Sequence, residues 1–90
     1  MKVDFYTSLK LKLEDQSTWP NLYVFKFIVP ADNEHVARVM ELFSPEAEIT
    51  TRESSKGKYI SITGREVMID AESVINRYKE AEKIEGIIAL

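Results

Sequence analysis

The alternation of apolar and polar positions from Ala47 to Thr63 predicts a β-hairpin. Ile49 in the first half, and Ile60 and Ile62 in the second, each lie between more polar neighbours. This period of two is typical of strands with one buried face. The polar residues 54–58 between the two halves include a glycine, which tolerates a positive φ in a tight turn. The stretch therefore predicts two antiparallel strands joined by an exposed tip.

The segment from Leu22 to Val29 predicts the strongest strand. It is largely apolar on both faces, as expected for a strand in the middle of a sheet. A lone lysine is costly to bury, so the face that carries Lys26 should be the more open one, and Pro30 should end the strand. The buried face then carries Tyr23, Phe25, Phe27 and Val29, and the open face carries Val24, Lys26 and Ile28.

Two later segments carry apolar residues at helical spacing. The first is capped by Asp32 or Asn33 and ends at Ser44. Its apolar stripe consists of Val36, Val39, Met40 and Phe43. The second is capped by Asp70 and stops before Gly86. Its apolar stripe consists of Ala71, Val74, Ile75, Tyr78 and Ala81, and its solvated face of Arg77, Lys79, Glu80, Glu82 and Lys83.

Residues 4–14 fit two patterns. Leucines alternate with lysines from residue 9 to residue 13, as in a strand, whereas apolar residues also recur every four positions, as in a helix. We favour a helix with Asp4 as its N-cap, because Lys, Leu and Glu are good helix formers. Trp19 precedes Pro20 and should be extended. We interpret it as a packing anchor, with a stacking surface for a ligand as the alternative.

The predicted order of elements is helix, strand, helix, strand, strand, helix and strand, with the last strand at residues 87–90. The last six elements make the βαββαβ unit of a ferredoxin-like sandwich, an α+β fold. Residues 1–20 then form an N-terminal helix and connector, and residues 21–90 form one ferredoxin-like (ACT-like) domain. Its four-stranded antiparallel sheet should have the first and third strands in the centre and two helices on one face.

The open face of this sheet should carry Val24, Lys26, Ile28, Glu48, Thr50, Arg52, Tyr59, Ser61 and Thr63. The core should consist of Phe25, Phe27, Val36, Met40, Phe43, Ile60, Ile62, Val74, Ile75 and Tyr78. Because the open face is partly apolar, we expect it to be covered by the N-terminal segment with Trp19 or by another subunit. The second form of cover implies a homo-oligomer through the open sheet face or an edge strand.

Composition and charge narrow the classes of partner. The chain has 90 residues, no cysteine, a net charge of -3 and an isoelectric point of about 5.2. An acidic chain lacks the basic footprint of nucleic-acid binding, so that partner is disfavoured. The lack of cysteine excludes disulfides, thiolate metal sites and cysteine nucleophiles. No segment approaches the roughly 20 apolar residues that span a bilayer, so we expect no membrane partner and a cytoplasmic location.

No catalytic or metal-binding pattern is found. His35, the single histidine, is interpreted as a surface residue in the first turn of a helix, without the other ligands that a metal site needs. Ser54 and Ser55 have no triad-like partners. We therefore expect a protein that is not an enzyme and has no cofactor, with an enzyme of unrecognised type as the alternative. A faint match to an RNA-binding strand between Lys56 and Ile62 leaves a weak RNA-binding module as a further alternative.

Three pieces of the chain together resemble one family. They are Leu22-Tyr23-Val24-Phe25-Lys26-Phe27-Ile28-Val29, then Ser54-Ser55-Lys56-Gly57-Lys58-Tyr59 with Ser61 and Thr63, then Tyr78 and Ile84-Glu85-Gly86. Over most of residues 5–90 the chain resembles the YbeD-like family of small uncharacterised bacterial proteins. The resemblance implies an ACT-like regulatory domain and carries no established activity. ACT domains usually bind small effectors near a glycine-containing turn after the first strand, whereas residues 30–33 here contain no glycine.

The hairpin tip is the candidate recognition site. It concentrates basic side chains in an acidic chain, and it adds serine hydroxyls and a tyrosine ring suited to an anionic group. The candidate residues are Arg52, Ser54, Ser55, Lys56, Lys58 and Tyr59. The alternative is an ordinary solvated turn. We therefore hypothesise a non-catalytic regulatory or protein-interaction module that binds a small anionic ligand or a protein partner.

Overall fold

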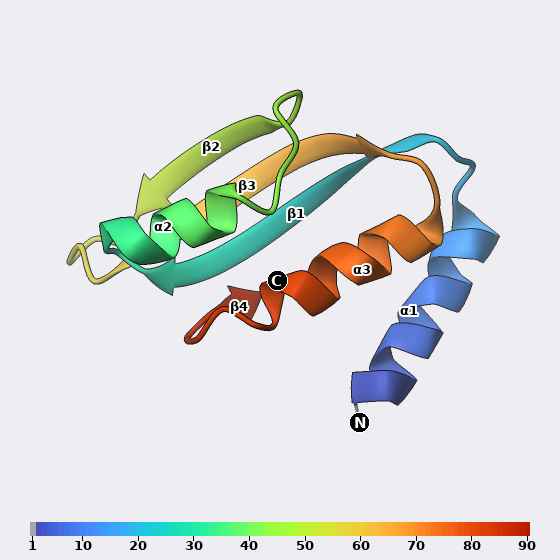
Figure 1. Ribbon diagram of the computed structural model, residues 1–90, viewed down its shortest axis with the longest axis horizontal. Coiled ribbons are helices and arrows are strands. Elements are labelled where there is room, and N and C mark those ends of the chain that lie inside the picture. Colours follow the sequence, from blue (N-terminus) through green and yellow to red (C-terminus); the bar gives the residue numbers. More distant parts are fainter. Residues whose placement is uncertain (1) are drawn as a thin grey trace.

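The computed structural model describes residues 2–90, with side chains from residue 5 onward, and has an α+β fold (Figure 1). The elements are α1 (Lys2–Gln16), β1 (Asn21–Pro30), α2 (Asn33–Met40), β2 (Glu48–Glu53), β3 (Tyr59–Met68), α3 (Ala71–Ala81) and β4 (Ile88–Ala89). The ferredoxin-like order and the N-terminal helix are confirmed. Asp4 is not an N-cap, because α1 begins before it and encloses it.

The four strands form one antiparallel sheet in the order β2-β3-β1-β4, so the first and third strands are central, as predicted. β1 and β3 pair along their whole length, with Phe27 opposite Ile62. Phe25 lies opposite Gly64, and a Cβ atom at Gly64 would overlap with the Phe43 ring. This glycine therefore makes room for an aromatic side chain in the core. β4 pairs with β1 at two positions only.

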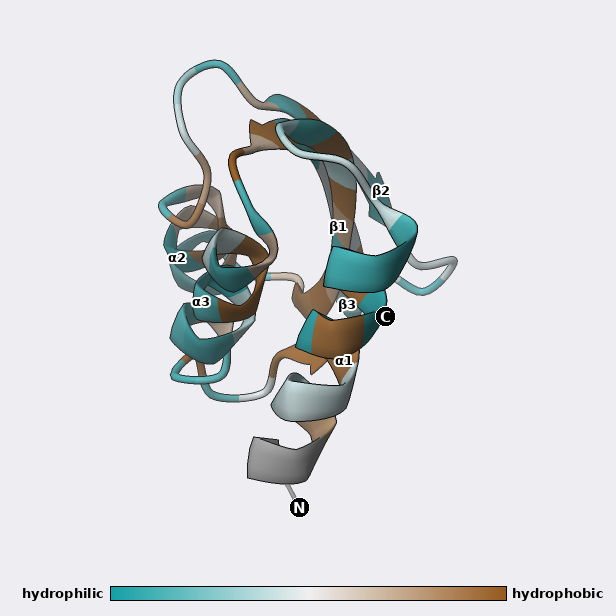
Figure 2. Ribbon diagram, turned by 90° about the vertical axis from the view of Figure 1, so that its right-hand side faces the viewer, coloured by the Kyte–Doolittle hydropathy of each residue, from teal (hydrophilic) through white to brown (hydrophobic). Residues whose placement is uncertain are grey.

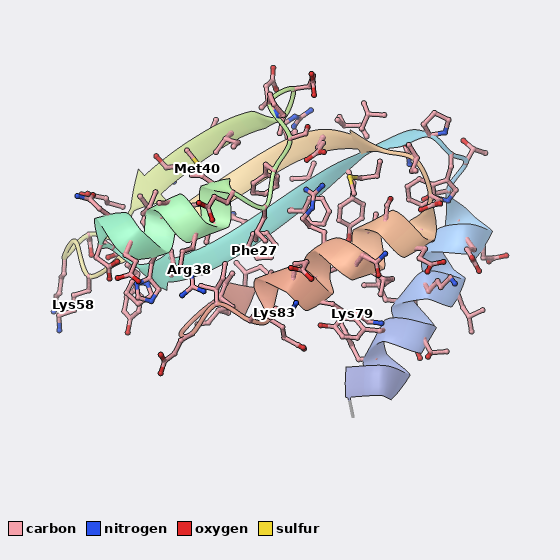
Figure 3. All side chains as sticks on the ribbon, viewed as in Figure 1. Phe27, Arg38, Met40, Lys58, Lys79 and Lys83 are labelled. Carbon is pink, nitrogen blue, oxygen red and sulfur yellow. The ribbon has the colours of Figure 1, made fainter. Side chains whose placement is uncertain are left out.

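Helices α2 and α3 cover one face of the sheet (Figure 2). The side chains with the least exposure are Phe25, Phe27, Val29, Val39, Ile62 and Val74. The predicted core is confirmed except at Met40, whose residue is 40 % exposed. α2 ends at Met40 and a turn then carries Phe43 into the core, which leaves Met40 on the side of α2 towards β2 (Figure 3).

Both predicted helix caps are confirmed. The Asp32 carboxylate accepts the backbone N–H of His35 at 2.8 Å. At the start of α3, Asp70 and Ser73 form a capping box, in which the backbone N–H of Ser73 donates to the Asp70 carboxylate at 2.7 Å. Each cap satisfies backbone donors that the first turn of a helix leaves without partners. The local sequence therefore decides where both helices begin.

The N-terminal segment lies beside α3 rather than over the open face of the sheet. α1 contacts α3, and Leu13 and Trp19 pack against the core. The predicted packing role of Trp19 is confirmed, and the peptide bond between Trp19 and Pro20 is cis. Val24 on the open face remains 47 % exposed, so cover by the N-terminal segment is wrong. No helix among residues 2–90 is long and apolar enough to cross a membrane.

The solvated face predicted for α3 is wrong at one position. Arg77 forms a bidentate ion pair with Glu66 of β3, with N–O distances of 2.8 and 3.2 Å. The two side chains are only 16 % and 11 % exposed. The Arg77 guanidinium also lies over the rings of Phe25 and Phe43, at 5.2 and 5.4 Å from their centroids. Arg77 therefore connects α3 to the sheet through a largely buried ion pair and is not a surface charge.

Candidate functional site

The hairpin tip is ordered by its own hydrogen bonds. The backbone N–H of Ser54 donates to the Tyr59 carbonyl at 2.8 Å, and the N–H of Gly57 donates to the Ser54 carbonyl at 2.9 Å. Tyr59 also donates its N–H to Ser54 Oγ at 3.2 Å. Gly57 has a φ of 70°, in the left-handed region that favours glycine. The turn is thus built from local chemistry, and it engages the Ser54 hydroxyl as an acceptor.

A surface depression of about 600 Å³ lies at the base of this hairpin, on the open face of the sheet. The residues that line it are Ile28, Arg52, Glu53, Ser54, Ser55, Tyr59, Ser61 and Ile88. The strand register brings them together, because Ser61 lies opposite both Arg52 and Ile28, and Ile28 lies opposite Ile88. The depression therefore extends across all four strands at one end of the sheet. We refer to it as the hairpin-base depression.

The structure brings together four of the six predicted site residues. Arg52, Ser54, Ser55 and Tyr59 line the hairpin-base depression. Lys56 and Lys58 do not line it, because they lie further out on the exposed tip, and Figure 3 shows the Lys58 side chain at the far end of the hairpin. Lys56 and Lys58 are therefore close to Arg52 in the sequence but do not share one surface with it.

Sequence reasoning missed the apolar floor of the depression. The sequence places Ile28 on the open face, but it assigns Ile88 only to a short final strand. The signal for Ile88 is present in retrospect, since a strand at residues 87–90 must turn alternate residues to opposite faces. Which neighbour Ile88 meets depends on the pairing of β4 with β1, and that pairing is a long-range contact.

The depression combines an apolar floor with donors on its rim. Within the described residues, no ion pair or side-chain hydrogen bond occupies the guanidinium of Arg52 or the hydroxyl of Ser55. Ser61 Oγ donates to the backbone carbonyl of Arg52 at 3.3 Å, which orients the Ser61 side chain. Glu53 contributes the one acidic group. Arginine presents its donors in a planar fork that matches carboxylate and phosphate groups, so an anion with an apolar tail fits this arrangement.

The same residues offer little for covalent chemistry. In the described part of the chain, no hydrogen bond joins Ser54 or Ser55 to a histidine or carboxylate that could act as a base. Between residues 5 and 90, no three His, Asp or Glu side chains lie close enough to hold a metal ion.

His35 lies in the first turn of α2 at the surface, as predicted, and its ring contacts two other segments. Its Nδ1 lies 2.8 Å from both carboxylate oxygens of Asp32, and its Nε2 lies 3.1 Å from the carbonyl oxygen of Glu85. The hydrogen bond with Asp32 raises the pKa of His35, and the backbone N–H of His35 is the main cause that lowers the pKa of Asp32. His35 thereby links the start of α2 to the turn that precedes β4 and Ile88.

A second cleft of about 440 Å³ lies between α1, α3 and β4. Tyr6 donates its hydroxyl to Glu82 at 2.7 Å, and burial together with this carboxylate raises the pKa of Tyr6 to about 12. The hydroxyls of Tyr23 and Tyr78 lie 3.0 Å apart, and burial raises the pKa of Tyr78. The hydroxyls of these three tyrosines are all engaged in hydrogen bonds, so this cleft offers fewer available polar groups than the hairpin-base depression.

Comparisons with known proteins place the chain in a family. Neither the curated proteins nor the solved structures contain a significant match to this chain. A family model described as a protein of unknown function, DUF493, matches residues 14–90, which leaves most of α1 outside the match. The matched part includes the whole sheet, α2, α3 and every residue of the hairpin-base depression. The chain therefore belongs to the DUF493 family of proteins of unknown function.

Proposed function

We propose that this protein is a non-catalytic recognition module whose hairpin-base depression binds a carboxylate or phosphate that carries an apolar group. The observation that carries the proposal is the position of Arg52. Its guanidinium borders an apolar floor of Ile28 and Ile88 and has no ion-pair partner within the described residues. An anion would supply that partner while its tail covers the floor, and charge-assisted hydrogen bonds of this kind are among the stronger ones.

The role of such a module is regulatory or connective rather than chemical. A YbeD-like, ACT-like regulatory domain of a cytoplasmic bacterial protein agrees with this role, because ACT domains respond to small effectors. The turn that ACT domains use for this purpose has no glycine here, since residues 30–33 read Pro-Ala-Asp-Asn. In our proposal the effector therefore lies at the hairpin between β2 and β3, against Arg52 and Tyr59, and not at the turn between β1 and α2.

A role in RNA binding has weaker support. RNA-binding sheets of similar topology stack two or three bases on aromatic side chains of the exposed face. On the open face of the described sheet, Tyr59 is the single aromatic residue. The net charge of -3 also gives the chain little attraction for phosphate backbones. A compact anion that uses one arginine fits better than a nucleic-acid strand.

The test is an NMR titration of the full chain with two probes, hexanoate and an N-acetylated peptide that ends in leucine. Both present a carboxylate next to an apolar group, the first as a free small molecule and the second as a protein C-terminus. We expect the amide signals of Arg52, Ser55 and Ile88 to shift, with a dissociation constant of about 1 mM for a single charged anchor. A preference for one probe identifies the source of the anion.

Three variants make the test specific. Arg52→Met should abolish the shifts, because it removes the charge and keeps a side chain of similar length. Lys26→Met is the matched control, since Lys26 lies on the same face but does not line the depression. Lys56→Met with Lys58→Met should bind nearly as the wild type does. Shifts that are absent at about 10 mM probe, or that persist unchanged in Arg52→Met, would contradict the proposal.

A further inference from the structure

The outer edge of β2 carries backbone groups without a strand partner in the described chain. β2 is a terminal strand of the sheet, with β3 on its one paired side. The hydrogen bond from Ser54 N–H to the Tyr59 carbonyl shows which residues face β3, because bonded pairs alternate along an antiparallel ladder. Thr50 and Arg52 therefore direct their backbone groups to β3. The N–H and C=O groups of Ile49, Thr51 and Glu53 point outward.

This edge is guarded against pairing with another strand only by the charges of Glu48, Arg52 and Glu53, and these charges admit a partner of matching pattern. Exposed edges are commonly guarded by charged side chains, lysine above all, by proline, by a bulge or by a very short length. β2 has six residues, contains neither lysine nor proline, and pairs with β3 without interruption. Its two central residues are Thr50 and Thr51, which are β-branched and exposed. The edge is therefore suited to receive one more strand.

We propose that two copies of this chain pair through their β2 strands, antiparallel, with the two-fold axis at Thr50. Residues that lie opposite each other in an antiparallel pair share one face of the sheet, so the axis must pass through a single residue. With the axis at Thr50, Glu48 lies opposite the second copy's Arg52, and the same contact occurs again across the axis. Ile49 then lies opposite Thr51 on the helix side.

Charge selects this register over the alternative. An axis at Thr51 would place Ile49 opposite Glu53, an apolar side chain against a carboxylate, and would leave Arg52 opposite Thr50. The axis at Thr50 instead creates two opposite-charge pairs and one threonine pair, and such cross-strand pairs are favourable. Glu48 is accessible for the contact, because its side chain is 83 % exposed. Its present ion pair with Arg65, at 3.6 Å, is also exposed and therefore weak.

The helix side of the edge adds an apolar contact. Met40 is exposed on the side of α2 that faces β2 (Figure 3). Pairing of two β2 strands would bring the second copy next to this side chain and cover part of its surface. A single pair of six-residue strands buries less than the area of a standard stable interface. The dimer should therefore be weak and depend on concentration.

The first test is sedimentation velocity of the full chain from about 10 µM to about 1 mM. We expect dimer to appear in this range. Glu48→Arg or Arg52→Glu alone should weaken dimerisation at least about tenfold, because each replaces two attractive pairs with two repulsive ones. The double variant should restore it. Lys26→Glu, on a central strand, is the control and should leave dimerisation unchanged. A chain that is monomeric throughout, or a double variant that stays monomeric, overturns the proposal.

The second test is disulfide trapping, which a chain without native cysteine allows cleanly. In the proposed register, two Thr50→Cys copies have Cα atoms about 4.5 Å apart, within disulfide range. Two Thr51→Cys copies lie diagonally, at roughly 7–8 Å. Thr50→Cys should therefore cross-link at least about tenfold faster than Thr51→Cys. Faster trapping of Thr51→Cys would overturn the register.

Failure of this dimer is distinguishable from failure of the proposed anion site. The double variant Glu48→Arg with Arg52→Glu should form dimers but should not bind hexanoate, because its depression has lost its cation. A monomeric wild type that still binds hexanoate through Arg52 overturns the dimer alone. Both proposals use the Arg52 guanidinium, so hexanoate should also shift the wild-type dimer towards monomer, and each proposal is judged by its own readout, sedimentation or NMR titration.

Discussion

Replacement of Arg77 by methionine tests how much the ion pair between α3 and β3 contributes to the free energy of unfolding. Glu66 would keep its place on the helix-facing side of β3 but would lose the bidentate cation at 2.8 and 3.2 Å. Removal of one partner of a buried ion pair costs about 3–5 kcal/mol. The pair is 16 % and 11 % exposed rather than fully buried, and methionine still packs on the Phe25 and Phe43 rings. We therefore expect a loss of about 2–3 kcal/mol.

The loss should be visible in urea unfolding followed by the fluorescence of Trp19. With a slope of about 1–2 kcal/mol per molar urea for a domain of this size, the midpoint should fall by about 1–2 M. The double variant Glu66→Gln with Arg77→Met should lose at least about 1 kcal/mol less unfolding free energy than the two single variants lose together. The reason is that no carboxylate is then left without its cation.

Acidification supplies a signature that loss of packing alone would not give. The hydrogen bond from Arg77 is the main cause that lowers the pKa of Glu66 below its ordinary value of 4.5. The stability that this pair contributes is therefore present above pH 4.5 and is lost as the pH falls through the pKa of Glu66 in the folded protein. The difference between wild type and Arg77→Met should shrink from pH 7 towards pH 3. A difference of equal size at both pH values would refute the reasoning.

Three further changes test the packing of the core, the contact between Gly64 and the Phe43 ring, and the contact between His35 and Asp32. Phe27→Ala should lower the free energy of unfolding by about 3–5 kcal/mol, and an unchanged melting temperature would show that its face is misassigned. Gly64→Ala should destabilise by about 1–3 kcal/mol because the Phe43 ring must move, and Phe43→Leu in the same chain should relieve part of that loss, as thermal melts would reveal. Since the pKa of His35 is raised above 6.5, its stabilising contact with Asp32 is fully present below pH 6.5 and is lost as the pH rises through the raised value. His35→Gln should therefore lower the melting temperature at pH 6 and have less effect at pH 9, and an effect that grows with pH would contradict this assignment.

The sequence by itself determined the elements of this protein, because the signals that define them are local. Apolar spacing placed β1, α2, α3 and the hairpin strands, and Asp32 and Asp70 marked both helix starts. The order of elements then limited the topology to a ferredoxin-like sandwich with β1 and β3 in the centre. Alternation along β1 also separated the buried Phe27 from the open face correctly.

The position of Arg77 shows what local signals leave open. Residue 77 lies three positions after Val74 and four before Ala81, so its spacing already placed it near the buried stripe. A charged side chain is tolerated at such a position only when an oppositely charged side chain lies beside it. The pattern of residues within α3 does not reveal such a partner. Glu66 becomes that partner because it shares a face of β3 with Ile62, and because α3 packs across that face.

The hairpin-base depression was decided by tertiary structure for the same reason. The sequence grouped Arg52, Lys56 and Lys58 because they are close along the chain, but the tip carries the two lysines outward, away from the lining. Ile88 joins Arg52 instead, although 36 residues separate them. Periodicity fixes which way a side chain points from its own strand. Which other side chains it contacts is fixed by the pairing of strands that are far apart in the sequence, and those contacts form the site.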